Sequence, residues 1–199
     1  MRARIQWIVA LTLAASFLVL TGCGAKEEKP LTAAQKQRRV RLLTSELSDQ
    51  HFAVRTKSAK ALAEMGIEAR PAIAELTKSL GDEYYGVRAW AAAALAAIGP
   101  DARSAASALA KAASDERREV RLAAIRAMGV IGETSDDVVL ALARRRATDE
   151  REDVREVALA VLLSFGTLAL PGLREAARRH PNPEVRQAVA DVLREIAPE

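Results

Sequence analysis

The sequence is poor in aromatic residues and in long β-branched runs, and both shortages bear on its fold. Phenylalanine, tryptophan and tyrosine together make up 4% of the 199 residues. Alanine, leucine, arginine and glutamate, which favour helices, are abundant instead. A β-rich fold would contradict local preference along most of the chain. The composition therefore predicts an all-α protein.

Neither sign of charge predominates. The chain has 30 lysine and arginine residues against 26 aspartate and glutamate residues, a formal charge of +4. Nucleic-acid-binding domains usually carry a larger and more clustered basic excess. We therefore expect no nucleic-acid partner.

The N-terminus has the anatomy of an export signal. Arg2 and Arg4 precede an apolar stretch from about Ile5 to Leu20, and small residues follow before Cys23. This stretch is short for a membrane-spanning helix, which needs roughly 20 apolar residues. The pattern predicts a signal peptide over residues 1–22.

Cys23 is the only cysteine, so the chain can form no internal disulfide. The sequence "LTGC" that ends at Cys23 resembles the lipobox of bacterial lipoproteins. The resemblance implies cleavage before Cys23 and attachment of a lipid to it. The alternative is an uncleaved N-terminal anchor. Either would place the rest of the chain outside the cytoplasm, at a membrane surface.

Residues 23–31 are expected to form the lipidated cysteine and a short tether. The stretch 24–31 is polar and contains Pro30, and eight residues reach at most about 28 Å when extended. In enterobacterial lipoproteins an aspartate after the cysteine favours the inner membrane, whereas Gly24 stands here. The resemblance therefore implies the periplasmic side of the outer membrane if the source is Gram-negative.

Between residues 54 and 186 the dipeptide Val-Arg occurs five times, at intervals of 33, 33, 34 and 31 residues. Repetition at such a period is typical of a repeat array. Twelve positions after each valine stands a small residue that can end a helix. A second helical stretch lies between this residue and the next Val-Arg, as at 68–80, 101–113 and 135–147. A capping box of Thr32 and Gln35 opens the first helix. We expect ten helices in five pairs, within a domain of residues 32–199. The valines are Val54, Val87, Val120, Val154 and Val185, and the stops are Gly66, Gly99, Gly132, Gly166 and Ala197.

An aspartate precedes each valine by five positions, except in the last unit, where His180 takes its place. This pattern resembles the HEAT repeat, in the variant of phycobilisome-lyase-like proteins. The resemblance implies a right-handed α-solenoid of five HEAT-like helix pairs, in which recurring aspartates and arginines form a ladder between neighbouring units. His180 puts the last rung in doubt. The ladder residues would be Asp49, Arg55, Asp82, Arg88, Asp115, Arg121, Asp149, Arg155 and Arg186.

Positions 2, 3, 6, 9 and 10 after each valine lie on or beside the helix face opposite the core. In the first and last units they are mostly polar, as the ends of a solenoid require. In the three middle units they are mostly apolar, which favours a groove for a protein segment. The alternative is that neighbouring helices cover them. The candidate partner-binding residues are Tyr84, Tyr85, Trp90, Leu122, Arg126, Val130 and Val157.

His51 and His180, the two histidines, fall in the first and last units and cannot share a site. No Ser-His-Asp or Cys-His arrangement has a good candidate. We therefore expect no catalysis, no metal and no cofactor. The sequence predicts a monomeric protein-binding scaffold, held at the envelope membrane through the lipid on Cys23. The alternatives are an accessory or bilin-lyase-like protein that binds a small molecule, and an architectural protein that binds anionic membrane surfaces.

Overall fold

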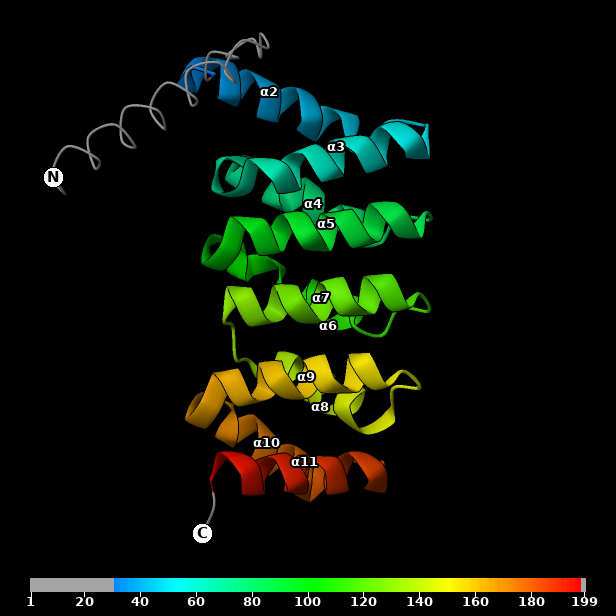
Figure 1. The fold of residues 1–199 in the computed structure, drawn as a ribbon, viewed down its shortest axis with the longest axis vertical. Coiled ribbons are helices and arrows are strands. Elements are labelled where there is room, and N and C mark those ends of the chain that lie inside the picture. Colours follow the sequence, from blue (N-terminus) through cyan, green and yellow to red (C-terminus); the bar gives the residue numbers. More distant parts are fainter. Residues whose placement is uncertain (1–30, 198–199) are drawn as a thin grey trace, which may run out of the picture. The chain divides into compact units, whose positions relative to one another are not determined.

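A computed structural model describes residues 31–197, and all regular elements in that range are helical. The all-α prediction is confirmed, as are ten α-helices in five consecutive pairs (Figure 1). Residues 1–30, which contain the predicted signal peptide, Cys23 and most of the tether, lie outside the described range. The elements are α2 (Ala33–Glu46), α3 (Phe52–Met65), η1 (Gly66–Ala72), α4 (Ile73–Ser79), α5 (Tyr85–Ile98), η2 (Gly99–Ala105), α6 (Ala106–Ala112), α7 (Arg118–Ile131), α8 (Asp136–Thr148), α9 (Glu152–Phe165), η3 (Gly166–Ala169), α10 (Leu170–Arg179) and α11 (Pro183–Ile196).

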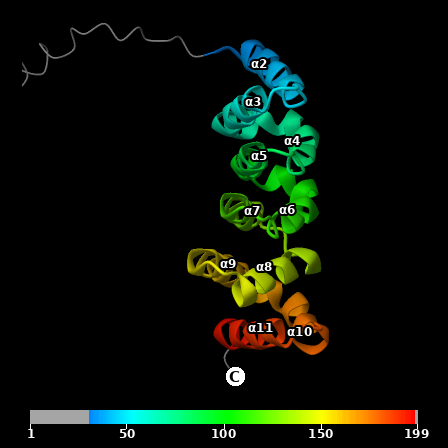
Figure 2. The ribbon, with the colours of Figure 1, turned by 90° about the vertical axis from the view of Figure 1, so that its right-hand side faces the viewer.

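The helix pairs stack in two layers. Figure 2 shows the five helices that begin near Val-Arg in one column, namely α3, α5, α7, α9 and α11, and α4, α6, α8 and α10 in the other. Successive members of the first column contact one another. α5, α7, α9 and α11 each contact the second-column helix that precedes them in the chain, and α3 contacts α2. The shared core lies between the two layers.

The valine that opens each repeat and the residue eight positions later fill this core, as the periodicity predicts. In the three middle repeats, Val87, Val120 and Val154 are fully buried. Leu95 and Leu162 are fully buried too, and burial of such a side chain stabilises the fold by about 1.5–3 kcal/mol. In the end repeats several of the equivalent residues are only half-buried, because within residues 31–197 these repeats have a neighbouring repeat on one side alone. Those half-buried residues are Val54, Met65, Leu193 and Ile196.

The four glycines predicted to end helices all have positive φ. Gly66, Gly99 and Gly166 combine φ of 60°, 79° and 52° with ψ of −130°, −146° and −134°. This region is accessible essentially to glycine alone, and it turns the chain directly into a 3-10 helix. The stretches 68–80 and 101–113, predicted as plain helices, are therefore 3-10 helices that continue as α-helices from Ile73 and Ala106.

The junction between the third and fourth pairs is different. Gly132 is left-handed, with φ 70° and ψ 21°, and a short non-helical link leads to α8, which has no 3-10 segment. α7 and α9 approach closely at Gly129, where an added Cβ would lie 2.9 Å from Cγ2 of Val161. A side chain at position 129 would therefore force Val161 to shift at this packing distance.

Within residues 31–197, one stretch, Glu152–Arg179, is long and apolar enough by composition to cross a membrane, and an 18-residue window in it has a mean hydropathy of 1.8. Gly166 breaks this stretch into α9 and α10, which lie in different layers. Val154, Leu162 and Leu173 within it are fully buried in the core or nearly so. Packing between helices therefore accounts for part of its apolar residues, whereas Leu163 and Leu168 are exposed.

Candidate functional site

Three buried ion pairs join the first four repeats. Arg88 is 9% exposed and donates from Nε and Nη2 to both carboxylate oxygens of Asp115, at 2.7 and 2.9 Å. Arg55 contacts Asp82 in the same way at 2.6 and 2.9 Å. Arg121 donates from Nη2 to Oδ1 of Asp149 at 2.9 Å, and its Nε lies 2.8 Å from Oδ2 without forming a hydrogen bond. The pairs of Arg55 and Arg88 are bidentate, and such pairs are stronger and more specific in geometry than single hydrogen bonds.

Each pair also fixes the turn that carries it. Nη1 of Arg88 donates to the carbonyl oxygens of Asp82 and Glu83 at 2.9 and 3.1 Å, in the turn before its own helix. The Asp115 carboxylate accepts the backbone N–H of Arg117 at 2.8 Å. One guanidinium therefore ties its own turn to the turn of the next repeat, and the same arrangement recurs at the other two pairs.

The ladder is incomplete at both ends of the described region. Asp49 accepts the backbone N–H of His51 at 2.8 Å and forms no ion pair with an arginine there. Arg155 and Arg186 donate from Nη1 to backbone carbonyls and pair with no carboxylate within residues 31–197. For Arg155, the position of the missing aspartate is that of His180. The residues expected to form a ladder therefore make three complete rungs.

Burial and hydrogen bonding act in opposite directions at Asp82. Burial raises the pKa of its carboxyl, but hydrogen bonds from Arg55 and from the backbone N–H of Tyr84 outweigh it and bring the pKa below the ordinary value of 3.8. At Arg145, which lies 3.4 Å from Asp149, burial lowers the guanidinium pKa. That arginine nevertheless stays charged at neutral pH. Both groups thus serve the rungs as ions.

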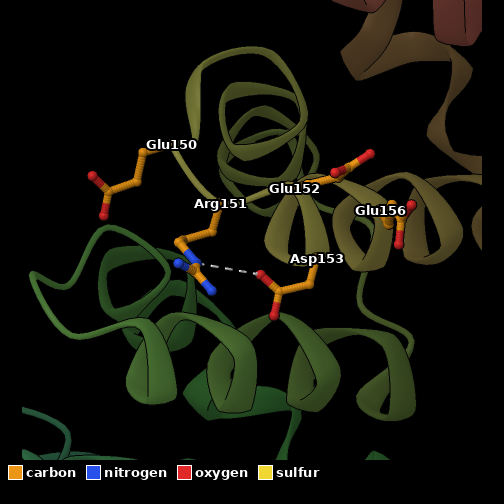
Figure 3. A pocket seen from close by; sticks show the side chains of 5 residues that line it. All are labelled: Glu150, Arg151, Glu152, Asp153 and Glu156. Carbon is orange, nitrogen blue, oxygen red and sulfur yellow. Dashed lines mark ion pairs between the residues drawn. The ribbon is translucent and has the colours of Figure 1, made fainter.

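An open cavity of about 660 Å³ lies at the start of α9, lined by residues of mostly negative charge (Figure 3). Arg151 points toward Asp153, with 3.9 Å between Nε and Oδ1, and Asp153 also pairs with Arg118 of α7. No group of three potential ligands in residues 31–197 could hold a metal ion. The cavity is lined by Glu150, Arg151, Glu152, Asp153 and Glu156.

The two tyrosines proposed as partner contacts pack within the fold. The ring of Tyr84 lies 4.4 Å from that of Phe52 and 5.1 Å from that of Tyr85. The Arg117 guanidinium lies 4.4 Å from the centroid of Tyr85. These contacts bridge the turns of three successive repeats, so they give both tyrosines a structural role.

Trp90 is half-buried against the edge of the core. Lys60, from α3, lies with Nζ 5.5 Å from the Trp90 ring centroid. A cation at this distance from an indole face is attracted by the ring quadrupole. The preceding repeat therefore covers part of Trp90, and the rest of the ring stays accessible.

The other proposed contacts divide between surface and core. Leu122 is only 8% exposed and belongs to the core, so it cannot line an open surface and must be removed from the candidate set. Arg126 is exposed and pairs with no acidic group in the part of the chain that the structure describes. Val130 is 55% exposed and Val157 is half-buried.

Two further exposed leucines were not among the predicted contacts. Leu163, nine positions after Val154, is 39% exposed, and its offset in the repeat could have identified it. Leu168 is 69% exposed but lies in η3, outside the repeating helix on which the offset analysis rests. We define the α5–α7–α9 face as Trp90, Ala97, Arg126, Val130, Val157 and Leu163.

Two layers of stacked helix pairs, joined by a recurring rung, define an α-solenoid. Residues 73–163 match HEAT repeats, and residues 169–199 match the HEAT repeat as well. The chain therefore contains HEAT repeats. No curated protein matches the sequence.

Solved solenoid structures share the fold at low sequence identity. The complex of CpcE and CpcF of phycocyanin lyase from Nostoc sp. PCC7120 contains a chain with 22% identity and a TM-score of 0.57, over 89% of this chain and 70% of that one. A computationally designed armadillo repeat protein for modular peptide recognition has 22% identity and a TM-score of 0.56, over 82% and 87%. A designed armadillo repeat protein in complex with the peptide (KR)4 has 20% identity and a TM-score of 0.54, over 83% and 87%.

Proposed function

We propose that this chain is a non-catalytic scaffold that binds a segment of another protein on the α5–α7–α9 face. One observation carries the proposal: Val130 and Leu163 are exposed on neighbouring helices that also present Arg126, which has no acidic partner among residues 31–197. Apolar side chains around an arginine are typical of the centre of a protein interface.

The composition of the face changes along the stack in a way that supports this proposal. The equivalent positions of the first repeat include Lys57, Lys60 and Glu64, and those of the last include Arg194 and Glu195, all exposed. Charged ends keep a solenoid soluble without contributing an apolar contact area. The partner would therefore bind at the middle repeats.

The known solenoids are consistent with this role. The armadillo proteins were designed for peptide recognition, and CpcE and CpcF form a complex with each other. Because the likeness to these proteins lies in the fold, we propose neither their ligands nor a lyase activity for this chain.

The second part of the proposal concerns location. The export signal over residues 1–22 and the lipobox-like "LTGC" support a lipid on Cys23 that holds the solenoid at the cell envelope. Cys23→Ala should abolish metabolic labelling with a fatty acid and release the protein from the membrane fraction. Unchanged labelling of this variant would overturn the anchor.

The binding proposal is tested by a charge placed on the face. Val130→Glu introduces a carboxylate at a 55% exposed position, and Leu42→Glu on α2, at 58%, is the matched control. Partners captured from detergent-solubilised envelopes should be lost with Val130→Glu and kept with Leu42→Glu, with circular dichroism showing that both variants fold. Equal recovery by both variants would contradict the proposal.

A further inference from the structure

Arg155 is a ladder arginine that makes the contacts to its own turn but not the contact to a carboxylate of the next repeat. Its Nη1 donates to the carbonyl oxygens of Asp149 and Glu150 at 2.8 and 3.3 Å, as Arg88 does to the carbonyls of its own turn. In Arg88 the Nε and Nη2 groups then bind the Asp115 carboxylate. Arg155 makes no such contact with any residue in the range 31–197.

His180 occupies the sequence position of the missing aspartate. It accepts the same backbone hydrogen bond but supplies no carboxylate. Its Nδ1 accepts the backbone N–H of Asn182 at 3.1 Å, as the Asp115 carboxylate accepts the N–H of Arg117 at 2.8 Å. The turn is thus preserved while the negative charge is lost. With Nδ1 as an acceptor, the neutral ring carries its proton on Nε2, which adds a donor.

The acidic residues near Arg155 in sequence do not form the missing ion pair with its guanidinium. Glu152 and Glu156 lie on α9 and line the open cavity of Figure 3, and neither forms an ion pair with Arg155. Glu150 instead lies 3.6 Å from Nη2 of Arg121. The Nε and Nη2 groups of Arg155 therefore have no carboxylate acceptor within residues 31–197.

We propose that Arg155, for which His180 stands at the sequence position of the missing aspartate, binds a carboxylate of the partner protein, an aspartate or glutamate side chain. The three complete rungs are the precedent, because each holds a carboxylate on the same two nitrogen atoms. The planar guanidinium is already oriented by two backbone carbonyls, so little of its freedom remains to be lost on binding. The inference rests on the proposed function, since it supplies a polar contact for a segment that crosses the α5–α7–α9 face.

The site and the α5–α7–α9 face share helix α9. Arg155 precedes Leu163 by eight residues on the same helix, about 12 Å at 1.5 Å per residue. A partner segment of four extended residues spans this distance. An acidic residue about four positions from an apolar one would therefore contact both sites together.

The test uses acetate as the probe and the full-length chain in detergent, labelled with nitrogen-15. The Nε–H resonances of Arg155 and Arg88 are followed by NMR as sodium acetate replaces sodium chloride at constant ionic strength, with Arg155→Lys to assign the Arg155 signal. The chemical shift of the Arg155 resonance should change with acetate concentration until it reaches a plateau. The Arg88 resonance should not change, because Asp115 already occupies that guanidinium. Equal responses of the two arginines, or none, would overturn the inference.

His180→Asp supplies the missing carboxylate within the chain. This variant should lose the acetate response at Arg155 and melt at a higher temperature than the wild type, because the fourth rung is restored. An unchanged acetate response would contradict the inference, and so would a larger response to inorganic phosphate than to acetate in the wild type. Since no partner is present, failure here leaves the outcome of Val130→Glu untouched, and the two proposals are tested separately.

Discussion

The carboxylate of Asp115 accepts two hydrogen bonds from the guanidinium of Arg88, at 2.7 Å from Nε and 2.9 Å from Nη2. Both side chains are about 11% exposed. The pair connects the helix of one repeat to the turn that begins the next. It fixes the spacing of α5 and α7, and hence the distances between residues of the α5–α7–α9 face.

Removal of the carboxylate should therefore be costly. Asp115→Ala leaves the Arg88 guanidinium buried without its main partner, and breaking a buried pair in this way costs about 3–5 kcal/mol. Glu116→Gln is the matched control, because that carboxylate lies 3.7 Å from Nη2 of Arg88 and is 82% exposed. The control should change the free energy of unfolding by less than about 1 kcal/mol in urea titrations. Similar losses for the two variants would contradict this role of the rung.

The close approach of α7 and α9 predicts a coupled pair of substitutions. Gly129→Ala gains about 1 kcal/mol of helix propensity, but its Cβ would lie 2.9 Å from Val161, and overpacking costs about 1–3 kcal/mol. In the background of Val161→Ala the clash is removed and the same substitution should be stabilising. A double-mutant cycle measured by urea unfolding should give a coupling above about 0.5 kcal/mol. If the two free-energy changes are simply additive, the residue at position 129 does not limit how closely α7 and α9 approach.

The lowered pKa of Asp82 predicts a dependence of stability on pH. The carboxyl has a lower pKa in the folded state than its ordinary value of 3.8, so its stabilisation is fully present above that value. It is lost as the pH falls toward the folded-state pKa. Asp82→Asn should be less stable at pH 7 and should show a smaller decrease in stability between about pH 5 and pH 2. Parallel curves for the two proteins would exclude Asp82 as a source of acid sensitivity.

The helix pairs could be predicted from the sequence because their signals are local. Buried valines and leucines at helical spacing mark one face, and a glycine marks the end of each helix. The ψ angles of Gly66 and Gly99, and the 3-10 helices that follow from them, depend on the direction in which the next helix must pack. The sequence therefore predicts that those segments are helical, but not that they begin as 3-10 helices.

The candidate surface was less predictable, because a helical wheel gives the direction of a side chain and not the distance to its neighbours. Leu122 points away from the valine face, yet close packing of the adjacent helices buries it. The contact of Lys60 with Trp90 and that of Arg117 with Tyr85 join different repeats. Their geometry depends on how the repeats stack, which the spacing of Val-Arg leaves open.

The most direct test of the central proposal is photo-crosslinking in the native envelope. A photoreactive amino acid is placed at Val130, at Leu163 and, as a control, at Leu42 on α2, all exposed apolar positions. The proposal predicts the same protein adduct from positions 130 and 163, competed by the unlabelled wild-type protein, and no such adduct from position 42. Absence of an adduct at 130 and 163, or the same adduct from all three positions, would contradict binding on the α5–α7–α9 face.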